Sequence, residues 1–357
     1  MTNPLPVGAT IGILGGGQLG RMLSVAASRL GLKTCIFEPS ANCPASHVAD
    51  VHMQASYDDT DALKAFAAAC DVITYEFENI PTSALDTLEA LRPIHPNRNA
   101  LATSQDRLVE KTFLQDLGLN TAPFANVETA EDMAQAIEKI GAPAILKTRR
   151  MGYDGKGQAR IMDAKDADGA FTSMAGNAAI LEGFVDFSKE ISVIAARNPQ
   201  GDVSCYDPGE NVHVDGILST TTIPAEITNS QQMDAVLLAA KILNALDYVG
   251  VMGVELFVTP QGLIVNEVAP RVHNSGHWTQ NGCTIDQFEQ HIRAVAGWPL
   301  GDGVRHSNVT MENLIGDDMD KVPEAAKTPA AIHLYGKEDV KPGRKMGHIN
   351  RVTGPVS

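Results

Sequence analysis

The sequence predicts a mixed α/β and α+β protein, and three observations lead to this expectation. Residues 9–38 alternate strand, glycine-rich turn, helix and strand, which is typical of a parallel α/β domain. Residues 254–258 and 263–265 are apolar strands separated by a turn containing Pro and Gly, which predicts an antiparallel hairpin. A chain of 357 residues, 44% of them hydrophobic, can bury sizeable cores, so we expect two or three domains.

Composition excludes several classes of protein. The formal net charge of −15 opposes non-specific binding to nucleic acid, which depends on neutralising phosphates. The five cysteines are scattered without a CxxC pair, which argues against a disulfide framework and a structural zinc site. No run of about 18 apolar residues is present for a membrane span, and residues 1–4 do not resemble a signal peptide. We therefore expect a cytoplasmic protein with no membrane partner.

The first element is a strand at residues 9–14, followed by a glycine turn at 15–20 and a helix from Arg21 to Leu30. A second strand at 34–37 leads into Glu38, 18 positions after Gly20, which matches the dinucleotide fingerprint. A nicotinamide-dependent oxidoreductase is therefore one hypothesis. The turn amides at a helix N-terminus could equally approach the phosphate of a nucleotide substrate, or the glycines could serve only a tight turn.

The alternation continues with a helix at residues 61–70 and a strand at 72–74, after which Glu76 follows. Ligands of open α/β sheets collect at the carboxyl ends of strands, so Glu76 is placed to contact whatever the glycine turn holds. The prolines of residues 91–97 predict the end of the first domain. A helix carrying Asp106, Arg107 and Lys111 is expected to begin near Ser104.

A basic, glycine-rich segment follows the strand at residues 144–147. The strand delivers Lys147, and residues 148–158 add three further cations and three glycines, which suits a loop that closes over polyphosphate. A basic hairpin is the alternative. The strand at 180–185, leading into Glu190, predicts a hinge where adenine lies between apolar side chains and a ribose meets a carboxylate.

The hairpin predicts a metal site. If its loop holds three residues, Glu255 lies opposite Glu267 with both side chains on one face. Two carboxylates directly opposite each other are destabilising unless a cation lies between them. Magnesium prefers carboxylate oxygens as ligands and normally binds together with phosphates. A solvated acidic face is the alternative. Residues 266–279 also gather an Arg, two His and two Asn after the strand, a composition typical of a site and not of a core.

In the order of these parts the chain resembles the ATP-grasp superfamily, and within it the family of 5-(carboxyamino)imidazole ribonucleotide synthases. The resemblance spans nearly the whole chain. The segments that carry it are residues 15–22, 75–79, 152–158, 213–217, 266–279 and 342–348. The resemblance implies an N-terminal Rossmann-like pre-ATP-grasp domain (1–103), two ATP-grasp subdomains (104–186 and 187–300) and a small C-terminal domain (301–357).

The activity implied by the resemblance is a ligase reaction of purine biosynthesis. ATP phosphorylates bicarbonate, and the activated carboxyl group passes to the exocyclic amine of 5-aminoimidazole ribonucleotide, with release of ADP and phosphate. Making carboxyphosphate supplies a better leaving group than hydroxide. The glycine-rich loop would exclude water as a lid. Relatives also imply a homodimer.

The resemblance assigns residues to each ligand. Mg²⁺ would be bound by Glu255 and Glu267, assisted by Asn266. Residues that would hold ATP are Arg107, Lys147, Glu182, Gly183, Phe184, Val185, Glu190, His213, Asn266 and Glu267, with the lid formed by Gly152, Tyr153, Asp154, Gly155, Lys156, Gly157 and Gln158.

Tyr153, Arg271, His273 and Asn274 would position bicarbonate. Asp154 would orient or deprotonate the amine, coupled to Lys345. Residues on the ribonucleotide side would be Gln18, Leu19, Glu76, Asp154, Lys156, Arg344 and Lys345.

Two departures from the family pattern stand out. Lys156 occupies a position that is usually Arg, which keeps the charge and loses bidentate phosphate contact. The sequence ends at Ser357, soon after His348, where many relatives have a longer tail, which puts packing of the small domain in question.

Two other hypotheses account for fewer of these features of the sequence. The oxidoreductase hypothesis rests on the first forty residues and does not account for the glycine loop or the paired glutamates. Another ATP-grasp enzyme, such as a formate-using glycinamide ribonucleotide transformylase or a biotin carboxylase, would differ in its acceptor.

Overall fold

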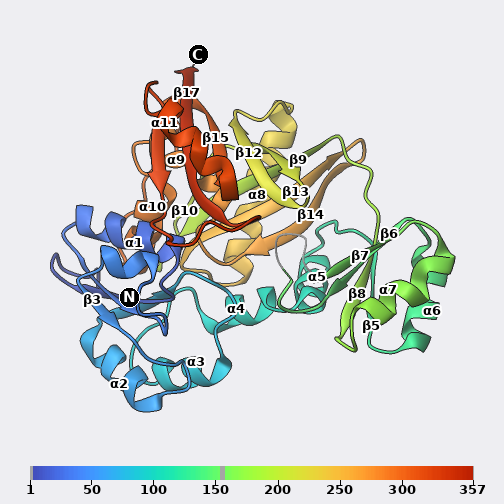
Figure 1. Cartoon of the computed structure of the whole chain (residues 1–357), viewed down its shortest axis with the longest axis horizontal. Coiled ribbons are helices and arrows are strands. Elements are labelled where there is room, and N and C mark those ends of the chain that lie inside the picture. The colour runs from blue at the N-terminus through green and yellow to red at the C-terminus, as the bar shows by residue number, and fades with distance from the viewer. Residues whose placement is uncertain (1–2, 153–156, 357) are drawn as a thin grey trace.

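The computed structural model describes residues 3–152 and 157–356, and its mixed helix and sheet content confirms the predicted fold class. Tyr153, Asp154, Gly155 and Lys156 lie outside the described residues. The described residues form three sheets: four strands at the N-terminus, four in a central lobe and nine in the largest sheet. In Figure 1 the blue N-terminal sheet lies at lower left, the green lobe at right and the red C-terminal strands at the top.

The N-terminal sheet is entirely parallel, in the order β3-β2-β1-β4. Apolar residues such as Ile11, Ile13 and Phe37 are fully buried between the helices on its two faces. The elements are β1 (Thr10–Leu14), α1 (Gln18–Arg29), β2 (Lys33–Phe37), β3 (Val51–Met53), α2 (Thr60–Ala69), β4 (Val72–Tyr75), α3 (Thr82–Glu89) and α4 (Arg98–Ser104).

Two helices begin at places that the sequence did not predict. Helix α1 starts at Gln18 and not at Arg21, because the backbone already turns into the helix after Gly17. The helix expected to begin near Ser104 is also misplaced, since α4 ends there and α5 (Arg107–Asp116) begins after Asp106. The Asp106 carboxylate accepts a hydrogen bond from the Leu108 amide at 3.0 Å, so it is the N-cap that sets this start.

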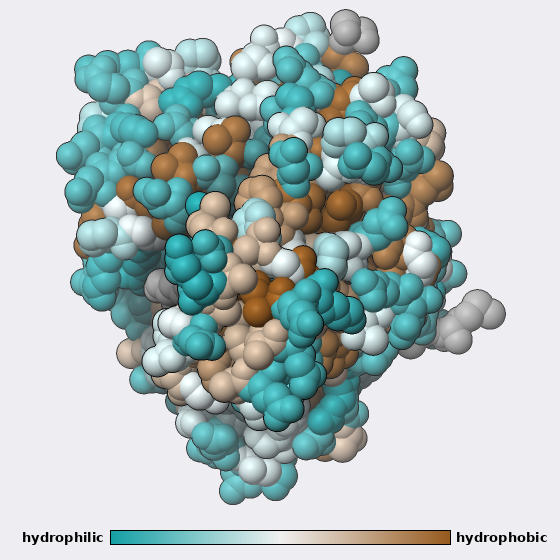
Figure 2. Space-filling view, turned by 90° about the vertical axis from the view of Figure 1, so that its right-hand side faces the viewer, coloured by the Kyte–Doolittle hydropathy of each residue, from teal (hydrophilic) through white to brown (hydrophobic). Residues whose placement is uncertain are grey.

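The lobe that follows is a four-stranded sheet in the order β5-β8-β6-β7, covered by two helices. Met133, Leu146 and Leu181 lie at the centre of its small core. Figure 2 faces this side of the molecule and shows a mostly hydrophilic surface with apolar residues gathered near its middle. The elements are β5 (Phe124–Val127), α6 (Ala130–Ile140), β6 (Ala144–Thr148), β7 (Gln158–Ile161), α7 (Ala167–Ser173) and β8 (Ala179–Gly183).

The nine-stranded sheet runs in the order β14-β13-β9-β11-β12-β15-β17-β16, with β10 paired to β9. Within the described residues 301–356, the strands therefore build no separate sheet, because β15 joins them to β12. The elements are β9 (Lys189–Arg197), β10 (Val203–Cys205), β11 (Gly209–Val214), β12 (Ile217–Ile223), α8 (Asn229–Ala245), β13 (Gly250–Thr259), β14 (Gly262–Ala269), α9 (Thr279–Gly282), α10 (Gln287–Val295), β15 (Ser307–Ile315), α11 (Val322–Ala325), β16 (Ala331–Leu334) and β17 (Lys345–Pro355).

The N-terminal domain is fixed to the large sheet through α1 and α10. Leu23, Phe288 and Ile292 belong to one buried cluster that spans both parts. At its rim the Arg29 guanidinium pairs with Asp286 at 3.0 Å and with Glu289 at 3.1 Å. The carboxyl ends of β1 and β4 are thereby held in a fixed position relative to the strands that carry the acidic pair.

The β13–β14 hairpin reaches the predicted pairing by a different route. Thr259 pairs with Gly262, so the loop holds two residues and not three. Continued without interruption, that register would place Glu255 opposite Asn266. A β-bulge beside Glu255 and Leu256 absorbs Asn266 as an extra residue and brings Glu255 opposite Glu267. The bulge therefore sets the acidic pair.

Candidate active site

The glycine turn is occupied by carboxylates of the protein itself. The backbone amides of Gly17 and Gly20 both donate to the Glu76 carboxylate, the latter at 2.7 Å, and the Gly16 amide donates to Glu38 at 3.2 Å. A Cβ atom added to Gly17 would lie 2.5 Å from Oε1 of Glu76. Burial raises the pKa of Glu76, although the two amides act against it. The glycine amides and the acidic residue of the dinucleotide fingerprint thus bind other groups of the protein. They are not left open for a dinucleotide, which removes the structural basis of the nicotinamide hypothesis.

Gln18 and Leu19 form the first turn of α1 beside Glu76. Leu19 is buried and Gln18 is half-buried. Their contact with a ribonucleotide, like that of Glu76, stays a prediction.

The acidic pair lies at the centre of the site. Nη1 of Arg107 pairs with Oε2 of Glu267 at 2.9 Å, and Nδ2 of Asn266 lies 3.5 Å from Oε2 of Glu255. Burial and then the neighbouring Glu267 raise the pKa of Glu255 to about 7. Burial would also raise the pKa of Glu267, but Arg107 outweighs it and lowers that pKa to about 2. The two carboxylates are therefore electrostatically unequal.

This pair fits a magnesium ion that is shared with phosphates. Two carboxylates face each other across one hairpin, and the pKa of Glu255 is raised first by burial and then by the charge of Glu267, both of which a cation would offset. In the described residues no three His, Cys, Asp or Glu side chains gather as a metal site. A site with only two protein carboxylates suits Mg²⁺, which keeps water or phosphate oxygens as its other ligands.

A buried carboxylate between two lysines lies beneath the acidic pair. Oε2 of Glu182 lies 2.9 Å from Nζ of Lys147 and 3.4 Å from Nζ of Lys111. The Lys111 ammonium also donates to the backbone oxygen of Asn266 at 2.8 Å. In the part of the chain that the structure describes, Oε1 of Glu182 is buried without a hydrogen-bond partner. Such an orphan acceptor fits a donor supplied by a ligand.

The remaining residues predicted to hold ATP lie on β9, on β11 and just after β8. Nδ1 of His213 on β11 lies 2.6 Å from Oε2 of Glu190 on β9. Strand β8 ends at Gly183, so Phe184, which is exposed, and the half-buried Val185 lie beyond it. They border the junction between the lobe and the large sheet, where the hinge was predicted.

The glycine-rich loop is anchored at both described ends. The Thr148 amide donates to the Gly157 oxygen at 2.8 Å, and a Cβ on Gly157 would lie 2.6 Å from Oγ1 of Thr148. Gln158 begins β7 and is exposed. Nη2 of Arg107 approaches the Gly152 oxygen at 3.4 Å, which links the loop to the partner of Glu267.

Two of the cations counted for this loop have another role. Arg149 contacts both oxygens of Asp106, at 2.9 and 2.7 Å, and Arg150 contacts Oδ2 at 3.3 Å. They tie the loop to the N-terminus of α5. Among the described cations of residues 147–158, Lys147 is the one that contacts the buried carboxylate of Glu182.

The segment after β14 carries Arg271, His273 and Asn274, three of the four residues predicted for bicarbonate. The guanidinium of Arg271 pairs with Glu78, which lies just beyond β4. Nε2 of His273 lies 3.5 Å from Oε1 of Glu255, and its Nδ1 contacts Oγ of Ser275 at 2.8 Å. Burial and then the charge of Arg271 lower the pKa of His273 to about 3, so its imidazole is neutral near pH 7.

The Asn274 side chain, which was predicted to position bicarbonate, pairs with another side-chain amide. Its side-chain amide exchanges two hydrogen bonds with that of Asn313 on β15, at 2.9 and 2.8 Å. This reciprocal pair joins the segment to the C-terminal strands. Direct contact of Asn274 with bicarbonate stays a prediction.

Arg344 and Lys345 lie where β17 begins, and both are half-buried. Nη1 of Arg344 donates to the Asp339 oxygen at 2.9 Å. The charge of Lys345 contributes to the lowered pKa of His273, which places it near the bicarbonate segment. Asp154, its predicted partner, lies outside the described residues, as do Tyr153, Gly155 and Lys156.

Part of the site lines a cavity of about 60 Å³. Arg107, Gly152, Glu267 and Arg271 line it, together with Glu78 from the N-terminal domain. The sequence predictions gave no role to Glu78 or to Lys111. Glu78 lay within a motif that matched the family, but its partner is 193 positions away, so local pattern gave no sign of the pair.

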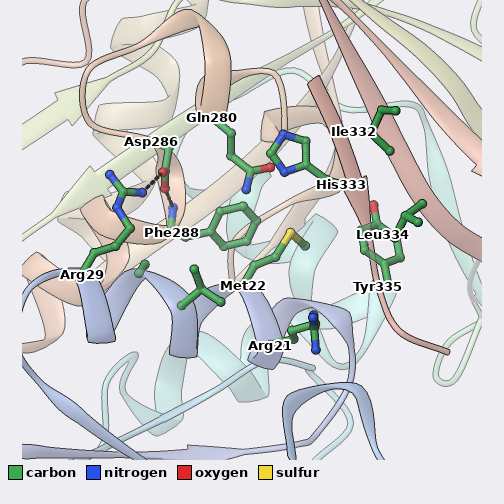
Figure 3. A pocket seen from close by; sticks show the side chains of 12 residues that line it. Arg21, Met22, Arg29, Gln280, Asp286, Phe288, Ile332, His333, Leu334 and Tyr335 are labelled. Carbon is green, nitrogen blue, oxygen red and sulfur yellow. Dashed lines mark hydrogen bonds and ion pairs between the residues drawn. The ribbon is translucent and has the colours of Figure 1, made fainter. Parts of the chain in front are cut away.

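A larger cavity, of about 240 Å³, lies elsewhere, between α1 and β16. Figure 3 shows Met22 and Phe288 pointing into it and Arg29 turned toward Asp286. The acidic pair and the glycine loop take no part in its lining. Its size therefore does not mark the reaction site.

Comparisons with known proteins agree along the chain. Residues 8–105 match the ribonucleotide synthetase preATP-grasp domain family, 112–288 the ATP-grasp domain family and 310–355 the phosphoribosylaminoimidazole carboxylase C-terminal domain family. N5-carboxyaminoimidazole ribonucleotide synthase of Brucella melitensis biotype 1 is 54% identical over 98% of this chain and 97% of its own.

Solved structures give the same result. An ADP complex of an N5-carboxyaminoimidazole ribonucleotide synthetase has a TM-score of 0.96 and 40% identity, over 99% of this chain and 94% of that one. The Aspergillus clavatus N5-carboxyaminoimidazole synthase, in complex with ADP and 5-aminoimidazole ribonucleotide, has a TM-score of 0.92 and 31% identity, over 98% and 95% of the two chains.

Proposed function

The chain belongs to the N5-carboxyaminoimidazole ribonucleotide synthase family of ATP-grasp ligases, and from this premise we propose how its residues carry out the ATP-dependent carboxylation of 5-aminoimidazole ribonucleotide. Membership confirms the family and the purine-biosynthetic function that the motifs predicted. The division of roles below, the use of bicarbonate and the requirement for magnesium are our proposals.

ATP binds between the lobe and the large sheet. Lys147 approaches its phosphates from β6, and the orphan oxygen of Glu182 accepts a hydrogen bond from the nucleotide. Glu190 and His213 bound the opposite wall. The loop from Gly152 to Gln158 covers the phosphates and excludes water, which protects a hydrolysable intermediate.

Glu255 and Glu267, with help from Asn266, would hold Mg²⁺, which would supply positive charge to the phosphates when bound. Arg107 keeps Glu267 ionised, and it contacts the Gly152 oxygen at the same time. Arg107 thereby links the start of the lid loop, at Gly152, to the predicted metal ligand Glu267.

Bicarbonate lies near Arg271 and His273. One oxygen of bicarbonate attacks the γ-phosphorus of ATP, the bond to ADP breaks, and carboxyphosphate forms. Arg271 stabilises this anion, and the neutral His273 positions it without adding a competing charge.

The exocyclic amine of the ribonucleotide then attacks the carboxyl carbon, phosphate leaves, and the nitrogen loses one proton. Asp154 accepts that proton, coupled to Lys345. Gln18, Leu19 and Glu76 hold the ribonucleotide at the turn, and Arg344 meets its phosphate. We also propose a cytoplasmic homodimer, as the family resemblance implies, and sedimentation of the purified protein tests the dimer.

One observation carries this proposal: the bulge at Asn266 places two carboxylates face to face beside a neutral histidine and an arginine. The experiment measures ADP release from MgATP and bicarbonate before and after 5-aminoimidazole ribonucleotide is added. We expect strong stimulation by the ribonucleotide, its loss in Glu267→Ala, and its retention in the control Glu226→Ala, whose carboxylate is 89% exposed.

Stimulation by glycinamide ribonucleotide or biotin instead would contradict the acceptor. Stimulation that persists in Glu267→Ala would contradict the metal assignment.

A further inference from the structure

The side chain of Arg271 is held along one edge by a single carboxylate. Its Nε lies 2.5 Å from Oε2 of Glu78, and its Nη2 lies 3.2 Å from Oε1. The third nitrogen, Nη1, donates to the Val272 oxygen at 3.2 Å. A planar guanidinium bound at two points cannot rotate about its stem without losing both contacts. The pair therefore fixes the direction in which the arginine presents its free edge.

Glu78 is itself well supported. It follows β4 in the N-terminal domain, and Nε2 of Gln105 donates to its backbone oxygen at 2.7 Å and to that of Ile80 at 3.2 Å. Two residues earlier, Glu76 binds the glycine turn. One short segment thus contacts both the turn on the ribonucleotide side and the arginine on the bicarbonate side.

Arg271 has other anionic neighbours toward which it could turn. Its charge interacts with Glu267 and Glu76 as well as with Glu78. The side chains of Arg271 and Glu78 are only 20% and 28% exposed, so an unpaired guanidinium here would be poorly solvated. Without Glu78, the predicted metal ligand Glu267, which lines the same cavity, is a carboxylate with which the guanidinium could pair.

We propose that Glu78 is a positioning residue for the carboxylation reaction: it aims Arg271 at bicarbonate and carboxyphosphate and keeps it from pairing with Glu267. The inference rests on the proposed function of Arg271. Glu78 touches no reacting atom in this scheme and acts through the arginine.

The test compares steady-state kinetics of wild type, Glu78→Gln and Glu78→Asp. Misdirecting a substrate-binding group by about 1 Å costs on the order of a hundredfold, so we expect the KM for bicarbonate to rise roughly ten- to a hundredfold in Glu78→Gln. The KM for ATP should stay near that of wild type, and Glu78→Asp should recover part of the loss. The matched control is Asp86→Asn, which removes a 61% exposed carboxylate that pairs with Arg98 in the same domain.

A second measurement separates positioning from structural support. If Glu78 acts only through Arg271, the bicarbonate defect of Arg271→Lys should not grow when Glu78→Gln is added. Multiplying defects, an unchanged bicarbonate KM, or an equal rise in all three substrate KM values with a lowered Tm would overturn the inference. A lowered bicarbonate KM would also overturn it, since Glu78 would then compete with the substrate.

Wild-type turnover with the ribonucleotide is measured first. Its absence would refute the proposed function and this inference together, whereas normal wild-type turnover with an unaffected Glu78→Gln would refute the inference alone.

Discussion

Replacement of Glu182 by Gln tests the buried charge cluster. The substitution removes the carboxylate between Lys147 and Lys111 while keeping the shape of the side chain. Breaking a buried ion pair by removing one partner costs about 3–5 kcal/mol. Two features of the structure favour the lower end of this range. Lys111 keeps its contact with the Asn266 oxygen, and Lys147 is 15% exposed and can reach water.

We therefore expect Glu182→Gln to lose about 3 kcal/mol of unfolding free energy, measured from urea transitions at pH 7. The control is Glu128→Gln, which removes a 53% exposed partner of Arg149 and should cost less than about 1 kcal/mol. Adding Lys111→Met to Glu182→Gln removes the stranded ammonium group, and it should recover roughly 1–2 kcal/mol.

Nucleotide affinity should fall as well, because the Gln amide is expected to turn its oxygen toward the two lysines and its NH2 group toward the position where the orphan oxygen of Glu182 accepts a hydrogen bond. Loss of one hydrogen bond to a charged group predicts a roughly tenfold or larger rise in the Kd for ATP by titration calorimetry. A loss of stability no greater than that of Glu128→Gln, or a double variant less stable than Glu182→Gln, would refute the reasoning about the buried cluster.

Three further predictions follow from individual contacts. Glu255→Gln should weaken Mg²⁺ binding about tenfold or more while leaving the fold intact, as measured by magnesium titration of ADP release; equal magnesium dependence in variant and wild type would remove Glu255 from the metal site. Burial lowers the pKa of His291 to about 3, so below pH 6.5 the unfolded state takes up a proton that the folded state refuses, and stability falls as pH drops toward 3. His291→Gln should reduce that slope by about 1.4 kcal/mol per pH unit between pH 6 and 4.5, and parallel urea curves for variant and wild type would count against this assignment. Gly253→Ala should lower turnover about tenfold or more with little change in ATP affinity, because its Cβ would lie 2.7 Å from Cβ of His273; an unchanged turnover number would show that His273 tolerates displacement.

Elements whose signals are local could be predicted from the sequence. Alternating apolar strands and glycine punctuation predicted the N-terminal α/β domain, and the turn at residues 259–262 predicted the hairpin. Motifs spread over the chain were enough to identify the family, because each combines residue types that its chemistry requires. Helix starts were less accurate, since the Asp106 cap and the early start of α1 depend on single backbone conformations.

How these parts meet depends on contacts between distant segments. A one-residue bulge brings Glu267 opposite Glu255 although the loop is one residue shorter than that pairing would otherwise need, and no periodicity in the sequence marks an inserted residue. Glu76 filled the glycine turn, and Glu78 reached Arg271 across 193 positions. Such contacts form because distant segments pack against the same cores. Charged groups then pair with the partners that lie nearest in space. The order of residues along the chain does not give these distances.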